Sequence, residues 1–95
     1  MKRYKLSSNY IIQQIGEDTA LLPCGDDEIV DFSKMIVLNE TGAWMVSKME
    51  RDAVSEDELL QGLLEVYDVS LDLLKGDVED FLNEMVSLNL LDVEE

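Results

Sequence analysis

The segment MIVLNETGAWM (residues 35–45) changes from a strand-like to a helix-like pattern within a few positions. Its first four residues (35–38) are apolar, and Asn39 follows them. A helix-like run resumes after Gly42. The Asn39 side chain can accept a hydrogen bond from a backbone N–H of the following turn, and Glu40 would lie at the positive end of the helix dipole. The segment therefore predicts a short strand that leads directly into a capped helix ending near Met49.

Upstream apolar runs predict further strands. NYIIQQIG (9–16) and TALLPC (19–24) are separated by a short turn and read as a β-hairpin. Pro23 has no backbone N–H, so it either ends the second strand or places it at a sheet edge. The run EIVDF (28–32) would form another hairpin with the MIVL of the opening segment. We therefore expect three or four antiparallel strands before residue 39.

The pattern after residue 50 is helical. Ser55 and Glu58 form the Ser-x-x-Glu capping box, and apolar residues with helical spacing follow as far as Tyr67. Ser70 then caps a third helix, whose predicted apolar face comprises Leu74, Val78, Phe81, Leu82, Met85 and Leu88. Strands followed by three helices predict an α+β fold of the winged helix-turn-helix type.

Length and composition indicate one small globular domain over residues 1–95. The chain is 46% apolar with a single proline, which is sufficient for a modest core. No apolar run reaches the roughly 18 residues of a membrane span, and no signal-peptide core follows the basic start. We therefore expect a cytoplasmic protein with no membrane partner. Because Cys24 is the lone cysteine and histidine is absent, an internal disulfide and an ordinary Cys/His site are excluded.

Acidic residues dominate the charge. The chain has 7 basic and 22 acidic residues and a formal net charge of -15. Such a surface repels phosphate backbones, which argues against a nucleic-acid partner, whereas it would tolerate or attract a basic or neutral peptide. Solubility alone is the alternative explanation of the charge.

No pattern indicates catalysis, a metal or a cofactor. The many carboxylates show no distinctive spacing, and no nucleophile is paired with a base. The motifs GDDE and SEDE are typical of a solvated turn and a helix start, and no EF-hand pattern is present. We therefore expect a protein that is not an enzyme and that holds neither metal nor cofactor.

Five segments together resemble the PqqD family. LLPCG, VDF, LNETGA, DELLQGLLEVYDV and DVEDFLNEMVSLNLL occur in that order, and the resemblance covers roughly residues 10 to 92. It implies a winged-helix peptide chaperone, also called a precursor-peptide recognition element. Such a domain binds the leader segment of a ribosomally made precursor peptide and presents it to an enzyme, with no catalysis of its own. The implied partners are that precursor peptide and a maturation enzyme, either a radical SAM protein or the leader peptidase of lasso-peptide processing.

The resemblance also implies where the peptide binds. The leader would add as a strand beside the last strand before the first helix, and the third helix would form the opposite wall of the groove. The peptide-binding residues expected on this basis are Met35, Ile36, Val37, Leu38, Asp77, Val78, Phe81, Glu84 and Met85. Strand alternation sends only half of the strand residues toward the groove, so core packing is the alternative role for each. The sequence leaves open the binding edge, the peptide and the chemistry that follows.

Two other classes of protein share some of these features. In a DNA-binding winged helix the third helix would enter the major groove of DNA. Here that helix has one basic residue, Lys75, and five acidic residues: Asp72, Asp77, Glu79, Asp80 and Glu84. An acyl carrier protein is also small and acidic, and VSLDLL has a superficial likeness to its attachment motif, with Ser70 as the acceptor. However, Val69 stands where that motif has aspartate, and strands precede it.

Overall fold

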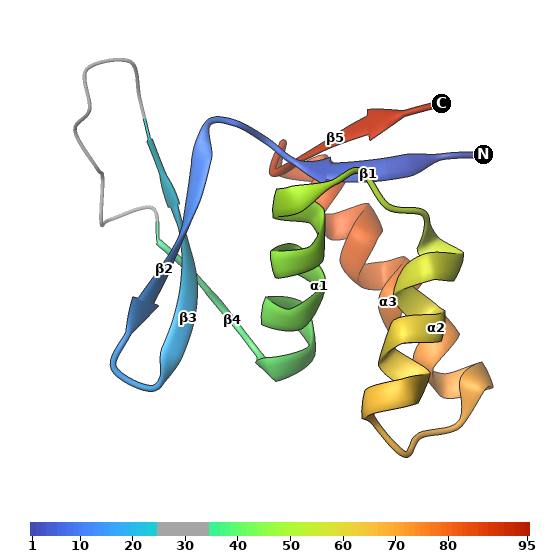
Figure 1. The fold of residues 1–95 in the computed structure, drawn as a ribbon. Helices are drawn as coiled ribbons and strands as arrows, with labels where there is room; N and C mark the ends of the chain where they lie inside the picture. The colour runs from blue at the N-terminus through green and yellow to red at the C-terminus, as the bar shows by residue number, and fades with distance from the viewer. Residues whose placement is uncertain (25–34) are drawn as a thin grey trace.

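The computed structural model describes residues 1–24 and 35–95, so the strand predicted at 28–32 lies outside the described residues. Three helices pack beside a three-stranded sheet and beneath a smaller two-stranded sheet (Figure 1). The strands are β1 (Arg3–Leu6), β2 (Tyr10–Ile15), β3 (Asp18–Pro23), β4 (Ile36–Leu38) and β5 (Leu91–Glu94). The helices are α1 (Glu40–Arg51), α2 (Glu56–Val66) and α3 (Leu71–Ser87). This arrangement confirms the α+β fold predicted from the element order.

The larger sheet is antiparallel, with strand order β2-β3-β4. The hairpin between β2 and β3 pairs Ile15 with Asp18, which leaves Gly16 and Glu17 as a two-residue loop. Gly16 has a φ of 62°, a conformation that tight hairpins require and that glycine adopts without steric cost. β4 pairs with β3 on the opposite side and leads into α1, as the opening segment predicts.

The smaller sheet pairs the two ends of the chain and was not predicted. β1 and β5 are antiparallel, and Leu6 and Leu91 at one end of the ladder are both buried. Tyr4 also forms a bridge to the link between α1 and α2: its N–H donates to the Val54 carbonyl at 2.7 Å, and the Val54 N–H donates back at 2.9 Å. The two termini therefore lie side by side over the helices (Figure 1).

All three predicted helix caps are present. The Asn39 side chain accepts a hydrogen bond from the Gly42 N–H at 2.7 Å. The Ser55 hydroxyl accepts one from the Glu58 N–H at 3.2 Å, and the Ser70 hydroxyl accepts one from the Leu73 N–H at 3.3 Å. Each bond satisfies a backbone donor that has no partner inside its helix. The limits differ slightly from the prediction, since α1 continues to Arg51 and α3 ends at Ser87.

The core lies between the helices and the inner faces of the two sheets. Its buried apolar side chains are Leu6, Leu21, Met45, Val46, Met49, Leu59, Leu60, Leu63, Leu74, Val78, Leu82, Met85, Leu90 and Leu91. Burial of one such side chain contributes about 1.5–3 kcal/mol. Leu88, predicted on the apolar face of the third helix, is instead its exposed C-cap, because the helix ends one residue earlier. Within residues 1–24 and 35–95, no helix has the length and apolarity needed to cross a membrane.

Candidate functional site

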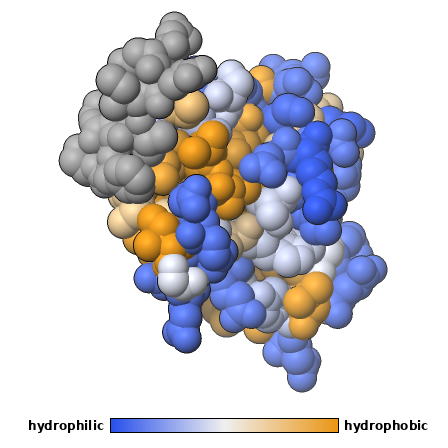
Figure 2. Space-filling view, turned by 60° about the vertical axis from the view of Figure 1, so that its left-hand side comes forward, coloured by the Kyte–Doolittle hydropathy of each residue, from blue (hydrophilic) through white to orange (hydrophobic). Residues whose placement is uncertain are grey.

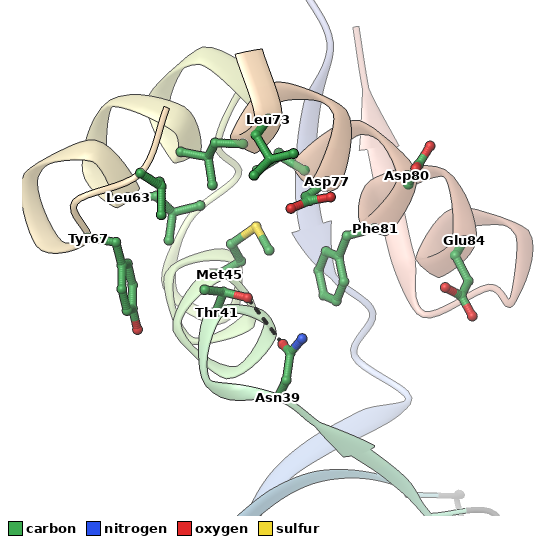
Figure 3. A pocket seen from close by; sticks show the side chains of 13 residues that line it. Asn39, Thr41, Met45, Leu63, Tyr67, Leu73, Asp77, Asp80, Phe81 and Glu84 are labelled. Atoms are coloured by element: carbon green, nitrogen blue, oxygen red, sulfur yellow. Dashed lines mark hydrogen bonds between the residues drawn. The ribbon is translucent and has the colours of Figure 1, made fainter. Parts of the chain in front are cut away.

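A cleft of about 480 Å³ opens where β4 meets α1, between α1, the end of α2 and the exposed side of α3 (Figure 3). Its lining residues come from all three helices and from the turn between α2 and α3. They are Asn39, Thr41, Met45, Leu63, Tyr67, Val69, Leu73, Leu74, Asp77, Val78, Asp80, Phe81 and Glu84. The strand that precedes α1 therefore ends at the mouth of this cleft.

The cleft has an apolar floor and an open mouth. Met45, Leu63, Leu74 and Val78 are core residues whose outer atoms form the floor. Leu73 stands at the mouth, where its side chain is 66% exposed. A ligand that covered this exposed side chain and the apolar floor would remove both from water, and this burial would stabilise the complex.

Phe81 forms one wall of the cleft through a close contact with the first turn of α1. The ring rests beside Gly42, and a Cβ added to that glycine would lie 3.1 Å from Phe81 Cε1 and 2.9 Å from Asn39 Oδ1. Asn39 Oδ1 also accepts a hydrogen bond from the Thr41 hydroxyl at 3.2 Å, drawn as the dashed line in Figure 3. Because Gly42 has no side chain, the first turn of α1 packs closely against α3 just after the end of β4.

The hydrogen-bonding pattern of the sheet shows which groups β4 presents at its outer edge. Pro23 opposes Tyr10 and has no N–H, while the next residue, Cys24, donates to the Asn9 carbonyl at 2.7 Å. Because hydrogen-bonded and non-hydrogen-bonded pairs alternate in an antiparallel ladder, Ala20 and Leu22 direct their backbone groups toward β2. Leu21, which lies between them, and Thr19 then direct their backbone groups toward β4.

The same alternation continues into β4. Leu21 pairs with Ile36 and Thr19 pairs with Leu38, so these β4 residues exchange backbone hydrogen bonds with β3. The N–H and C=O of Val37, between them, point away from β3 toward the outer edge. Its side chain is 54% exposed as well. Among the described residues β4 is the last strand of its sheet, and Val37 offers one donor and one acceptor to an added strand.

The rim of the cleft is acidic. Asp77, Asp80 and Glu84 line it from α3, and none of the described lining residues is basic. On the opposite side, partial burial raises the pKa of Tyr67 above its usual 10.0, and the nearby Glu40 carboxylate raises it further through hydrogen bonding and charge. The described part of the chain contains no group of three or more potential ligand side chains that could hold a metal.

The structure distributes the predicted peptide-binding residues over three places. Asp77, Val78, Phe81 and Glu84 line the cleft. Met35 to Leu38 follow the adjacent strand edge and lie outside the cleft lining, with Val37 outermost. Met85 is only 3% exposed and belongs to the core rather than to the cleft lining.

The part of the cleft formed by α2 and the start of α3 was not predicted from the sequence. Tyr67 and Leu73 line that part, and Asp80 completes the acidic rim. A second stripe at helical spacing contains Leu73, Asp77 and Glu84, and it borders the predicted apolar face of the helix, to which Phe81 belongs. A second stripe with mixed apolar and acidic residues was the available indication of a solvent-facing site.

These features define the chain as an α+β domain of the winged helix-turn-helix type, in which a strand edge that no other described strand covers leads into an apolar cleft. The family model for Coenzyme PQQ synthesis protein D (PqqD) matches residues 10–91. The chain belongs to the PqqD family, which confirms the resemblance found in its sequence.

The comparison with solved structures agrees on the fold. TbiB1 in complex with the TbiA(beta) leader peptide is 20% identical in sequence, with a TM-score of 0.72. The alignment covers 93% of this chain and 94% of that chain. A search of curated proteins finds no match.

Proposed function

We propose that this protein is a peptide chaperone that binds the leader segment of a ribosomally synthesised precursor peptide and presents it to a separate enzyme. The observation that carries the proposal is the outer edge of β4, which no other described strand covers, with the N–H and C=O of Val37 directed outward beside an apolar cleft. An extended peptide can add to such an edge through its backbone while alternate side chains enter neighbouring pockets. Membership of the PqqD family and the leader peptide bound by TbiB1 support the proposal.

Backbone pairing alone is too weak to hold the peptide. β4 has three residues, and each added hydrogen bond contributes about 0.5–1.5 kcal/mol, whereas ordering each peptide residue costs about 1–2 kcal/mol. The cost of ordering the peptide therefore equals or exceeds the gain from backbone pairing. Micromolar affinity corresponds to about -8 kcal/mol, so side-chain anchors in the cleft must supply most of the binding free energy.

The proposal assigns no catalysis to this chain. The cleft holds carboxylates and one phenol, but the described lining residues include no nucleophile paired with a base. Ser70, the residue that an acyl carrier would modify, caps α3 instead. The chemistry belongs to the partner, for which a radical SAM maturase and a lasso-type leader peptidase are the two candidates.

Titration with a labelled leader peptide tests the proposal. The probe is the N-terminal segment of a short precursor encoded beside this gene, followed by fluorescence anisotropy, with a scrambled peptide of the same composition as the control. We expect saturable binding with a Kd below about 100 μM for the native order alone. Equal binding of the scrambled peptide, or no saturation, would contradict the proposed function.

A further inference from the structure

The pleat of β4 determines which side chains of an added peptide would face α3. Ile36 and Leu38 are half-buried and pack against the core, whereas the side chain of Val37 faces solvent. A strand paired to β4 continues this pleat, so its side chains alternate between the same two faces. Every second peptide residue would therefore point into the space between β4 and α3.

The surface of α3 that borders this space combines apolar and acidic side chains. Figure 3 shows Asp77 directed into the cleft beside Leu73, and Glu84 further along the helix, beyond Phe81. Asp77 and Glu84 are seven residues apart, which corresponds to about 10 Å along a helix. Same-face residues of an extended strand are about 7 Å apart at a separation of two and about 13 Å at a separation of four. Flexible lysine or arginine side chains can span the difference.

We propose that the cleft selects a leader segment in which a large apolar residue is accompanied by lysine or arginine at alternate positions. The apolar side chain would occupy the floor formed by Met45, Leu63 and Val78, and the basic side chains would pair with Asp77 and Glu84. This inference rests on the proposed function and specifies the chemistry of its ligand.

Charge complementarity supports this choice of ligand. The three carboxylates of α3 face no basic residue among the described residues that line the cleft. Glu40 adds negative charge on the opposite side, beside Tyr67. An acidic peptide residue at the same place would meet repulsion from both walls. Exposed ion pairs of this kind each strengthen binding about two- to fivefold, and screening by salt weakens them.

Selection from a displayed library of random peptides tests the inference and does not require the precursor to be identified. The three selection targets are the wild-type protein, the double variant D77N/E84Q, and the control variant E50Q/E79Q. All four residues are exposed, and Glu50 and Glu79 lie outside the cleft lining, so both double variants lose the same charge. Circular dichroism confirms that each target is folded before selection.

We expect the wild-type protein and E50Q/E79Q to enrich peptides with an apolar residue and alternate lysine or arginine. For D77N/E84Q the basic preference should disappear while the apolar preference remains, and wild-type-selected peptides should bind it about four- to twenty-fivefold more weakly. Apolar peptides with no basic preference on the wild-type protein would overturn this inference and leave the proposed function standing. Equal loss in both double variants would overturn it as well, because net charge alone would then explain the effect. If the wild-type protein enriches no peptide at all, the proposed function itself fails.

Discussion

Substitution of proline at Val37 tests the assignment of the outer strand edge. Proline removes the backbone N–H that points away from β3, and it leaves the two ladder positions, Ile36 and Leu38, unchanged. Because the Val37 side chain is exposed, the change creates no cavity in the core. Proline is tolerated on edge strands for this reason. The free energy of unfolding should therefore fall by no more than about 1 kcal/mol.

Peptide binding should respond much more strongly to Val37→Pro. The complex loses one hydrogen bond and leaves a peptide carbonyl without its donor, which together cost about 1–2 kcal/mol. That cost corresponds to about five- to thirtyfold weaker binding. Val37→Ala is the matched control, since it removes the side chain and keeps the donor, and it should bind within about twofold of the wild-type protein. Fluorescence anisotropy with the labelled leader peptide measures the binding.

Ile36→Pro should show the opposite behaviour. Its N–H donates within the sheet, to Leu21, so proline there breaks the ladder and leaves a carbonyl without its donor, which costs about 1–3 kcal/mol of stability. Urea denaturation followed by circular dichroism measures this loss. If Val37→Pro binds the leader as tightly as Val37→Ala does, or if it unfolds as readily as Ile36→Pro, the assignment of the outer edge is wrong.

Three further substitutions test the packing and the charge around the cleft. Gly76→Ala should raise the free energy of unfolding in urea by about 0.5–1 kcal/mol, because no described atom beyond the adjoining helix backbone lies within 4 Å of the added methyl group. Gly62→Ala should lower it by about 1–3 kcal/mol and shift the Trp44 fluorescence, because the methyl group collides with that ring. Spectrophotometric titration should show that the pKa of Tyr67 is raised above its usual 10.0, and Glu40→Gln should lower that pKa. The folded state holds the Tyr67 proton more tightly than the unfolded state does. The stability that this contributes is present below pH 10 and is lost as the pH rises above it.

Local features of the sequence predicted the helices and the strands next to them. A cap depends on a side chain and a backbone group three residues away, so Asn39, Ser55 and Ser70 could be identified without tertiary information. The hairpin formed by β2 and β3 likewise depends on a short turn between two apolar runs. The order of these elements was sufficient to predict the fold.

The smaller sheet could not be predicted in the same way. RYKL and LDVE are short and mostly polar, and each becomes a strand only by pairing with the opposite end of the chain. The register places Arg3 opposite Glu94 and Lys5 opposite Asp92, so opposite charges face each other across the pair. The basic residues near the N-terminus therefore face acidic residues of β5 in the smaller sheet.

The cleft was predicted only in part, because each position on α3 has two possible roles. Met85 and Val78 share one apolar stripe, yet only Val78 reaches the cleft. The difference depends on where α1 and α2 cover the helix. The apolar surface on the face shown in Figure 2, which is bordered by hydrophilic surface, likewise forms only in the folded chain. The outward direction of the Val37 backbone depended on the register of two strand pairs, which Pro23 helps to fix.

Amide hydrogen exchange at Val37 tests strand addition most directly. In the free protein, the N–H groups of Ile36 and Leu38 are bonded to β3 and should exchange slowly, whereas that of Val37 faces outward and should exchange fast. Exchange is followed by NMR with and without a saturating amount of the leader peptide. The account predicts that bound peptide slows exchange at Val37 by tenfold or more and shifts the amides of α3 between Leu73 and Glu84. Saturable binding that leaves Val37 exchange unchanged, with shifts confined to residues 10–23, would contradict strand addition along β4.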